Sequence, residues 1–225
     1  MSADIAFVHG FATDSRRTWS EAGWLELVGD AGRNAYAIDL LGHGQADKPH
    51  ESEAYRDLHL WVDERLPPGR IDAIGFSLGG QLLLTLAALK PERFERLVLL
   101  GVGDTVFESA SDPSLLVDAL RGTADETDRH GQHFAALASE PDSDPEALIA
   151  CLQRPRFNLT EEMLCSVEIP VLIALGDADF VGPADRLVAA LPTATFTTLR
   201  GVDHFVTPKS FDALSVALEF VGAGL

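Results

Sequence analysis

Short apolar runs alternate along the chain with longer stretches of mixed polarity. The runs are nearly continuous in apolar residues, which is typical of parallel strands covered on both faces. Strands are predicted at Ile5–Val8, Ala35–Ile38, Ile71–Ile74, Leu97–Leu100, Val171–Leu175 and Thr195–Leu199. Helices are predicted between them, at Trp19–Gly29, Tyr55–Arg65, Leu78–Leu89, Ala184–Ala190 and Ser210–Val221. This alternation predicts an α/β fold, with a mostly parallel six-stranded sheet and helices on both of its faces.

The alternation is interrupted between Asp104 and Pro170, where no strand pattern occurs. Short amphipathic helices are predicted there at Pro113–Arg121, Glu126–Ala138 and Pro145–Leu152. An unstructured loop of this length would be unusual within a compact domain. We therefore expect a helical insertion at 104–170, and an α/β core formed by 1–103 and 171–225.

Charge limits the kinds of partner. The 225 residues carry 17 Lys and Arg against 35 Asp and Glu, a formal net charge of −18, of which −10 falls in the insertion. Nucleic acids and anionic membrane surfaces are bound by clustered cations, and no such cluster is visible. We expect a small-molecule substrate as partner, with no nucleic acid and no membrane.

Neither a leader nor a metal site is apparent. The N-terminus lacks the charged and apolar regions of a secretory signal, and no apolar run reaches the roughly 18 residues that cross a bilayer. A cytoplasmic location is expected. Cys151 and Cys165 do not form a metal-ligand pattern; we expect two buried free thiols, with a disulfide between them as the alternative. No metal and no cofactor are expected.

The strongest chemical motif is G-F-S-L-G at 75–79, between a predicted strand and a predicted helix. In this context a G-x-S-x-G sequence forms a sharp, strained turn that exposes the serine hydroxyl. The following helix N-terminus favours a developing oxyanion. Ser77 is therefore the candidate nucleophile, and an ordinary glycine-rich turn is the alternative.

A serine nucleophile needs a base, and the base needs an acid that orients it. Asp179 and His204 each follow a predicted strand, as Ser77 does, and the carboxyl ends of parallel strands meet at one edge. We expect the three side chains to converge there in a catalytic triad. Six other histidines lack this combination of order and position: His9, His43, His50, His59, His130 and His133.

The order Ser77, Asp179, His204 resembles that of the α/β-hydrolase superfamily, and the resemblance extends from residue 4 to about residue 221. His9-Gly10-Phe11 is similar to the family's oxyanion loop. D-L-L-G-H-G at 39–44 and the I-P-V sequence at 169–171 also match family positions, and the insertion falls where the family places its cap. The resemblance implies that the N–H groups of Phe11 and Leu78 form the oxyanion hole.

Several residues have alternative interpretations. Asp104 follows an earlier strand and is the rival for the triad acid, whereas Asp177 is interpreted as a turn residue. His9 and His43 fit loop-orienting positions better than catalytic ones. Asp203 stands where the family usually has glycine. Its carboxylate could interact with the imidazole of His204 or point into solvent.

The family commonly begins with a two-stranded hairpin, which the residues before Asp4 are too few to form. The strand Ala35–Ile38 is then expected at an edge of the sheet. A short strand flanked by Arg33 and Asp39 favours a monomer, and an edge-paired homodimer is the alternative.

The resemblance implies a serine hydrolase that cleaves a small carboxylic ester, a thioester or a lactone through an acyl-enzyme. One alternative is a hydrolase of a carbon–carbon bond or an enol-lactone, acting on a carboxylate-bearing substrate. Arg154 and Arg156 would then bind the carboxylate; otherwise they are solvated charges. A non-catalytic ligand receptor on the same fold is the alternative from a different class.

Overall fold

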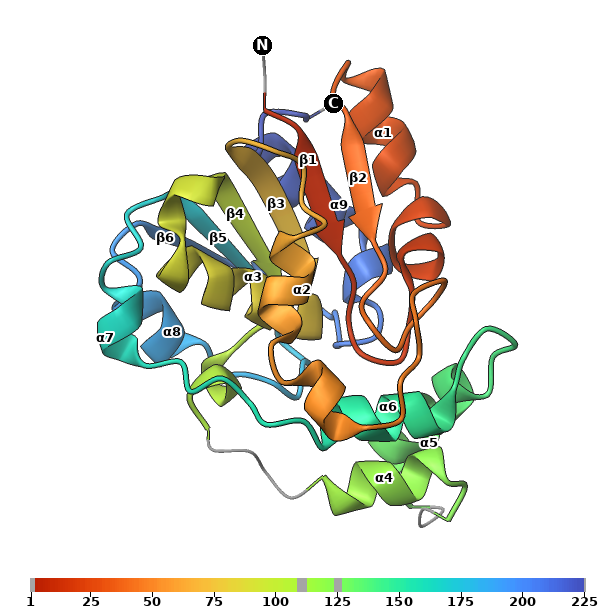
Figure 1. Cartoon of the computed structure of the whole chain (residues 1–225). Coiled ribbons are helices and arrows are strands. Elements are labelled where there is room, and N and C mark those ends of the chain that lie inside the picture. Colours follow the sequence, from red (N-terminus) through yellow and green to blue (C-terminus); the bar gives the residue numbers. More distant parts are fainter. Residues whose placement is uncertain (1–2, 109–112, 124–126, 225) are drawn as a thin grey trace.

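One parallel sheet of six strands organises the chain (Figure 1). The computed structural model describes residues 3–108, 113–123 and 127–224. The strand order is β2-β1-β3-β4-β5-β6, so β2 and β6 are the edges. The strands are β1 (Ile5–Val8), β2 (Ala35–Ile38), β3 (Ile71–Phe76), β4 (Phe94–Leu100), β5 (Val171–Gly176) and β6 (Ala194–Leu199). The predicted six-stranded α/β fold, with Ala35–Ile38 at an edge, is confirmed.

The near-continuous apolar runs reflect burial on both faces of the sheet. Every residue of β1, β3 and β5 is buried. On β1, Ile5 and Phe7 pack into one hydrophobic core, whereas Ala6 and Val8 pack into a second core on the opposite face. Side chains alternate between the two faces of a strand, so an interior strand needs apolar residues at successive positions.

Helices cover both faces, as predicted (Figure 1). On one face lie α1 (Trp24–Asp30) and α9 (Phe211–Phe220), whose apolar residues share a core with alternate strand residues. On the other face lie α2 (Leu58–Asp63), α3 (Leu78–Leu89) and α8 (Asp185–Ala190). This three-layer arrangement leaves the loops at the carboxyl ends of the strands free to form a site.

The segment between β4 and β5 is helical in its described residues. Its helices are α4 (Ser114–Leu120), α5 (Arg129–Ala138), α6 (Pro145–Leu152) and α7 (Glu161–Leu164). The first three share a small core of their own, against which Phe11 and Ala12 of the β1–α1 connection pack. In Figure 1 they gather beyond the carboxyl ends of the strands. The segment therefore lies next to the loops that carry the candidate site residues.

Two predicted helices are divided in the structure. In place of Trp19–Gly29, a π-helical turn at Arg16–Ser20 precedes α1, and Gly23 between them has a φ of 81° that ends one helical path before the next begins. In place of Tyr55–Arg65, a 3₁₀ turn at Ser52–Tyr55 precedes α2. Further 3₁₀ turns occur at Pro91–Arg93, Asp104–Phe107 and Thr207–Lys209.

The insertion differs from the prediction in smaller ways. The helix predicted from Glu126 begins at Arg129, where the Asp128 carboxylate accepts a hydrogen bond from Gly131 N–H; Glu126 lies outside the described residues. Helix α7 was not predicted, because four residues are too few to show a helical period.

The cysteines correct one expectation. Both thiols are free, and Cys151 is buried as predicted, but Cys165 is exposed because it ends the surface helix α7. Over the described ranges, no helix combines the length and apolar character that crossing a membrane requires.

Candidate active site

Ser77 sits at a strained turn between β3 and α3. Its φ is 50° and its ψ is −115°, a left-handed backbone conformation that non-glycine residues rarely adopt. The glycines around it are required by space. A Cβ on Gly75 would lie 2.6 Å from the Gly80 Cα, and one on Gly79 would collide with the carbonyl oxygen of Val8. The turn therefore has the geometry that the G-x-S-x-G motif predicts.

The structure brings Ser77, His204 and Asp179 together. The Nε2 of His204 lies 2.9 Å from the Ser77 Oγ, and its Nδ1 lies 3.0 Å from each carboxylate oxygen of Asp179. The Asp179 side chain is fully buried, and the His204 side chain nearly so. A carboxylate at Nδ1 favours the tautomer with the proton on Nδ1, which leaves Nε2 free to accept the serine proton.

Two phenyl rings flank the imidazole. The centroid of the His204 ring lies 5.0 Å from that of Phe76 and 4.5 Å from that of Phe180. Gly101 closes another side, since a Cβ there would lie 3.2 Å from the imidazole Nδ1. These contacts restrict the ring to the orientation that joins Ser77 to Asp179.

Phe11 and Leu78 line the same pocket as Ser77. Phe11 follows β1, and Leu78 is the first residue of α3. Within the described part of the chain, neither amide donates a hydrogen bond to another protein group. The two N–H groups are therefore available to an oxygen atom of a ligand.

The rival acid has a different partner. The carboxylate of Asp104 accepts hydrogen bonds from the backbone N–H groups of Leu187, at 2.9 Å, and Arg186, at 3.3 Å. These amides belong to the first turn of α8, whose orphan donors Asp104 thus satisfies. Asp104 has a structural role, and it does not contact His204.

Asp177 and Asp203 also bond to backbone amides. Asp177 accepts a hydrogen bond from Gly201 N–H at 2.7 Å, as expected of a turn residue. Asp203 accepts a hydrogen bond from Val206 N–H at 2.9 Å and makes no ion pair with the imidazole of His204. The question that the sequence left open is answered, because the Asp203 carboxylate orders its own loop.

His9 and His43 lie buried behind the Phe11 loop. His9 contacts the carbonyl of Gly10 through Nδ1, at 2.7 Å, and accepts a hydrogen bond from Leu40 N–H through Nε2. The Nδ1 of His43 lies 3.0 Å from the Leu41 carbonyl, and its Nε2 has no partner among the described residues. Neither ring contacts Ser77, so both are loop-orienting residues.

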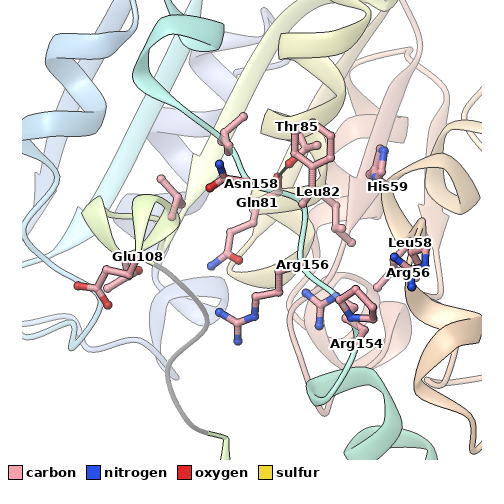
Figure 2. A pocket seen from close by; sticks show the side chains of 15 residues that line it. Arg56, Leu58, His59, Gln81, Leu82, Thr85, Glu108, Arg154, Arg156 and Asn158 are labelled. Atoms are coloured by element: carbon pink, nitrogen blue, oxygen red, sulfur yellow. Dashed lines mark hydrogen bonds between the residues drawn. The ribbon is translucent and has the colours of Figure 1, made fainter.

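Two pockets meet at Ser77 and His204. One, of about 480 Å³, follows the loop that carries His204 as far as Lys209. The other, of about 260 Å³, follows α3 and is lined by Gln81, Arg154 and Arg156. A third pocket, of about 70 Å³, adjoins the second and shares these three residues (Figure 2). The site thus has room for two different halves of a substrate.

The two arginines of the insertion stand in the pocket wall. Arg154 donates a hydrogen bond to the Cys151 carbonyl at 2.6 Å. Solvent reaches Arg156, yet the pocket surrounds it closely enough that burial, together with the charge of Arg154, lowers its pKa. No acidic side chain in the described residues forms an ion pair with either guanidinium.

Sequence reasoning missed an aromatic cluster that joins α5 to the site loops. The ring of His133 lies 3.7 Å from that of Phe205, and His130 lies 4.7 Å from Phe180. Phe134 contacts both Phe11 and Phe205. A signal was present, because Phe180 and Phe205 directly follow Asp179 and His204 in the sequence.

Metal-ligating side chains do not gather at this site. Across residues 3–108, 113–123 and 127–224, no group of three His, Cys, Asp or Glu side chains is arranged to hold a metal ion. The chemistry that the arrangement offers is that of a serine hydroxyl beside a histidine base and a carboxylate.

Comparison with known proteins agrees with this architecture. Residues 5–138 match the profile of the α/β hydrolase fold family. A 2-hydroxymuconate semialdehyde hydrolase of Pseudomonas sp. is 37 % identical over 33 % of this chain, and a pimeloyl-[acyl-carrier protein] methyl ester esterase of Nitrosomonas europaea is 35 % identical over 44 %. The matched regions span 28 % and 36 % of those relatives' own lengths.

The similarity in fold extends over nearly the whole chain. The solved structure of Est816, described as an N-acyl homoserine lactone degrading enzyme, superposes with a TM-score of 0.72 at 21 % identity. The match covers 97 % of this chain and 93 % of that one.

Proposed function

The chain belongs to the α/β hydrolase fold family, and from that premise we propose that it is a serine hydrolase acting on small carboxylic esters through an acyl-enzyme. One observation carries the proposal: a single imidazole lies within hydrogen-bond distance of both the Ser77 hydroxyl and the buried Asp179 carboxylate. This arrangement allows a serine to act as a nucleophile near neutral pH.

Acylation begins with proton transfer. The Nδ1–H of His204 donates to Asp179, so Nε2 accepts the Ser77 proton as the serine oxygen attacks the substrate carbonyl. The carbonyl oxygen becomes negatively charged, and the N–H groups of Phe11 and Leu78 stabilise it. Removing one such donor typically costs about 10²- to 10³-fold in rate, so two free amides supply a substantial part of the catalysis.

Collapse of this intermediate completes the first half of the reaction. The protonated Nε2 of His204 donates its proton to the leaving oxygen, the alcohol departs, and the acyl group stays on Ser77. Water then enters, loses a proton to the same Nε2 and attacks the acyl carbonyl. The second collapse returns the proton to the Ser77 oxygen and releases the acid.

The helices α4 to α6 act as a cap in this proposal. Their helix α5 contacts the loops that carry Phe11, Asp179 and His204, through Phe134, His130 and His133. A cap in this place would determine the shape of the two pockets that meet at Ser77, and with it the substrate. The names of two relatives, a methyl ester esterase and a lactone-degrading enzyme, fit acyl transfer to water.

A fluorophosphonate probe with a panel of esters tests the proposal. We expect covalent labelling of the protein at Ser77, and hydrolysis of p-nitrophenyl esters, lactones or acyl thioesters. A folded protein that is neither labelled nor active on any of them would instead be a ligand receptor on a hydrolase fold.

Hydrolysis of a carbon–carbon bond next to a carbonyl is the second candidate. It uses the same serine and histidine, and the name of one relative, 2-hydroxymuconate semialdehyde hydrolase, is of this kind. The arginines in the wall of the Ser77 pocket favour it, because such substrates carry a carboxylate. Cleavage of a vinylogous 1,5-diketo acid, with esters left intact, would select this candidate over the first.

A further inference from the structure

The nucleophile stands at one end of a groove that follows helix α3. Gln81 N–H donates to the Ser77 carbonyl at 2.9 Å, and the Thr85 hydroxyl donates to the Gln81 carbonyl at 2.9 Å, so the three residues occupy successive turns. The pocket that holds Ser77 contains Gln81, and the adjoining pocket contains Gln81 and Thr85. At about 1.5 Å per residue, Gln81 lies about 6 Å from Ser77 along the helix axis.

Two positive charges stand where these pockets join. Arg154 and Arg156 line both pockets together with Gln81, and in Figure 2 the three side chains occupy the same part of the cavity. Glu108 is the one acidic residue among the described residues of either lining, and it forms no ion pair with them. The junction is therefore cationic in a chain whose net charge is −18.

Several other arginines in this protein pair with carboxylates. Arg33 and Arg96 share Asp72, Arg93 pairs with Asp63, and Arg186 pairs with Glu161. Placing two guanidinium groups side by side in a concave wall is unfavourable unless an anion joins them. No carboxylate among the described residues pairs with either guanidinium, so we look to a ligand for that anion.

We propose that this junction binds a carboxylate at the far end of the substrate's acyl group, so that the preferred substrate is a half-ester of a dicarboxylic acid. The assignment rests on the proposed serine hydrolase function. A guanidinium presents paired N–H donors whose geometry matches a carboxylate, which gives orientation as well as affinity.

The acyl half, rather than the alcohol, is the half that reaches the arginines. During acylation the leaving oxygen must face His204 Nε2, and the larger pocket follows that residue's own loop through Phe205 and Pro208. The groove along α3 is lined by Leu78 and Gln81, neither of which lines the larger pocket. The alcohol therefore leaves through the larger pocket, and the acyl chain extends toward Gln81.

Helix geometry sets the length of that acyl chain. The arginines meet the groove at Gln81, about 6 Å from Ser77, and an extended chain advances about 1.2 Å per bond. Spanning about 6 Å takes about five bonds between the scissile carbonyl carbon and the far carboxyl carbon. Glutaric and adipic half-esters fit this span better than malonic ones.

The test compares monomethyl esters of dicarboxylic acids with methyl esters of monocarboxylic acids of the same length, by titrating the acid released. We expect kcat/KM to favour the half-ester, most strongly at glutarate or adipate. Arg156→Gln should lower the ratio of half-ester to neutral-ester kcat/KM by about 10- to 100-fold, mainly through KM. Arg156→Lys, which keeps the charge, should restore part of the ratio.

Arg65→Gln is the matched control, because it removes one positive charge from a side chain that lies over Trp61 and lines neither pocket. It should keep the wild-type ratio. A wild-type protein that cleaves neutral esters as well as half-esters at every length, or an unchanged ratio in Arg156→Gln, would overturn the anion site and leave the hydrolase function standing.

A binding measurement tests the anion site separately from the hydrolase function, for the case in which no ester is cleaved. Titration of adipate into Ser77→Ala protein, followed by calorimetry, reads the anion site without any turnover. Binding that Arg156→Gln abolishes would support the site even if no ester were cleaved. Absence of binding in both proteins would overturn it.

Discussion

Asp179 presents both carboxylate oxygens to the Nδ1 of His204, each at 3.0 Å, while a second candidate acid, Asp104, is occupied by the first turn of α8. The two aspartates follow neighbouring strands of the sheet, β5 and β4. Sequence position alone left both possible, and the hydrogen bonds assign them different roles.

Replacing each aspartate by asparagine should separate these roles. Asp179→Asn should reduce kcat by roughly 10³-fold or more, because an amide at Nδ1 favours the wrong imidazole tautomer. Asp104→Asn should leave kcat within a few-fold and reduce the free energy of unfolding by about 1 kcal/mol, the usual value of a helix cap. Ester hydrolysis and urea unfolding of both variants provide the measurements, and the reverse ranking in kcat would move the acid to Asp104.

Gly79→Ala tests the turn that carries the nucleophile. The new Cβ would collide with the carbonyl oxygens of Val8 and His9, so we expect a loss of about 1–3 kcal/mol in stability together with lower activity. Gly29→Ala is the matched control, since nothing lies within 4 Å of its Cβ and alanine favours the helix α1. Equal melting temperatures of Gly79→Ala and the wild type would show that the turn is not constrained in this way.

His43 should make the protein less stable in acid. Burial and the neighbouring His9 lower the pKa of His43 to about 3, against about 6.5 in an unfolded chain. Between these values the unfolded chain binds a proton that the folded protein does not. The free energy of unfolding therefore falls with pH from about 6.5 to about 3, by up to about 1.4 kcal/mol per pH unit.

Urea unfolding of His43→Gln and wild type at about pH 7, 6 and 5 measures this contribution. The free energy of unfolding of His43→Gln should depend less steeply on pH than that of the wild type. His50 gives a control of opposite sign, because a hydrogen bond to Asp144 raises its pKa. Its contribution is present below the unfolded pKa and is lost as the pH rises through the folded one. His50→Gln should therefore lose stability more steeply than the wild type as the pH falls. Parallel curves of unfolding free energy against pH for the wild type and His43→Gln would contradict the role of His43.

The fold was predictable where local pattern and tertiary environment agree. The bounds of β1 and β2 match the prediction at every residue. Strand β1 is buried and apolar throughout, and the partly exposed edge strand β2 is still set off by the polar residues Asn34 and Asp39 that flank it. The prediction failed at Gly23, where a positive φ divides one amphipathic stretch into two helices. It also missed α7, whose four residues depend on packing against α8 rather than on their own periodicity.

The candidate site was predictable in part for the same reason. Ser77, Asp179 and His204 follow strand ends, and the parallel sheet brings strand ends together. The position of Arg154 and Arg156 depends on how α4 to α6 pack over the core, which no local pattern records. Phe76 and Phe180 adjoin Ser77 and Asp179 in the sequence, but their contacts with the His204 ring depend on where the tertiary structure places the His204 loop.

The kcat of Ser77→Ala for the ester that the wild type cleaves best tests the central claim most directly. We predict a loss on the order of 10³-fold or more in a protein with wild-type circular dichroism, because the hydroxyl is the atom that forms the acyl-enzyme. Ser166→Ala, at an exposed serine outside both pockets, should keep wild-type turnover. Substantial hydrolysis by folded Ser77→Ala protein would contradict the assignment of Ser77 as nucleophile and the mechanism built on it.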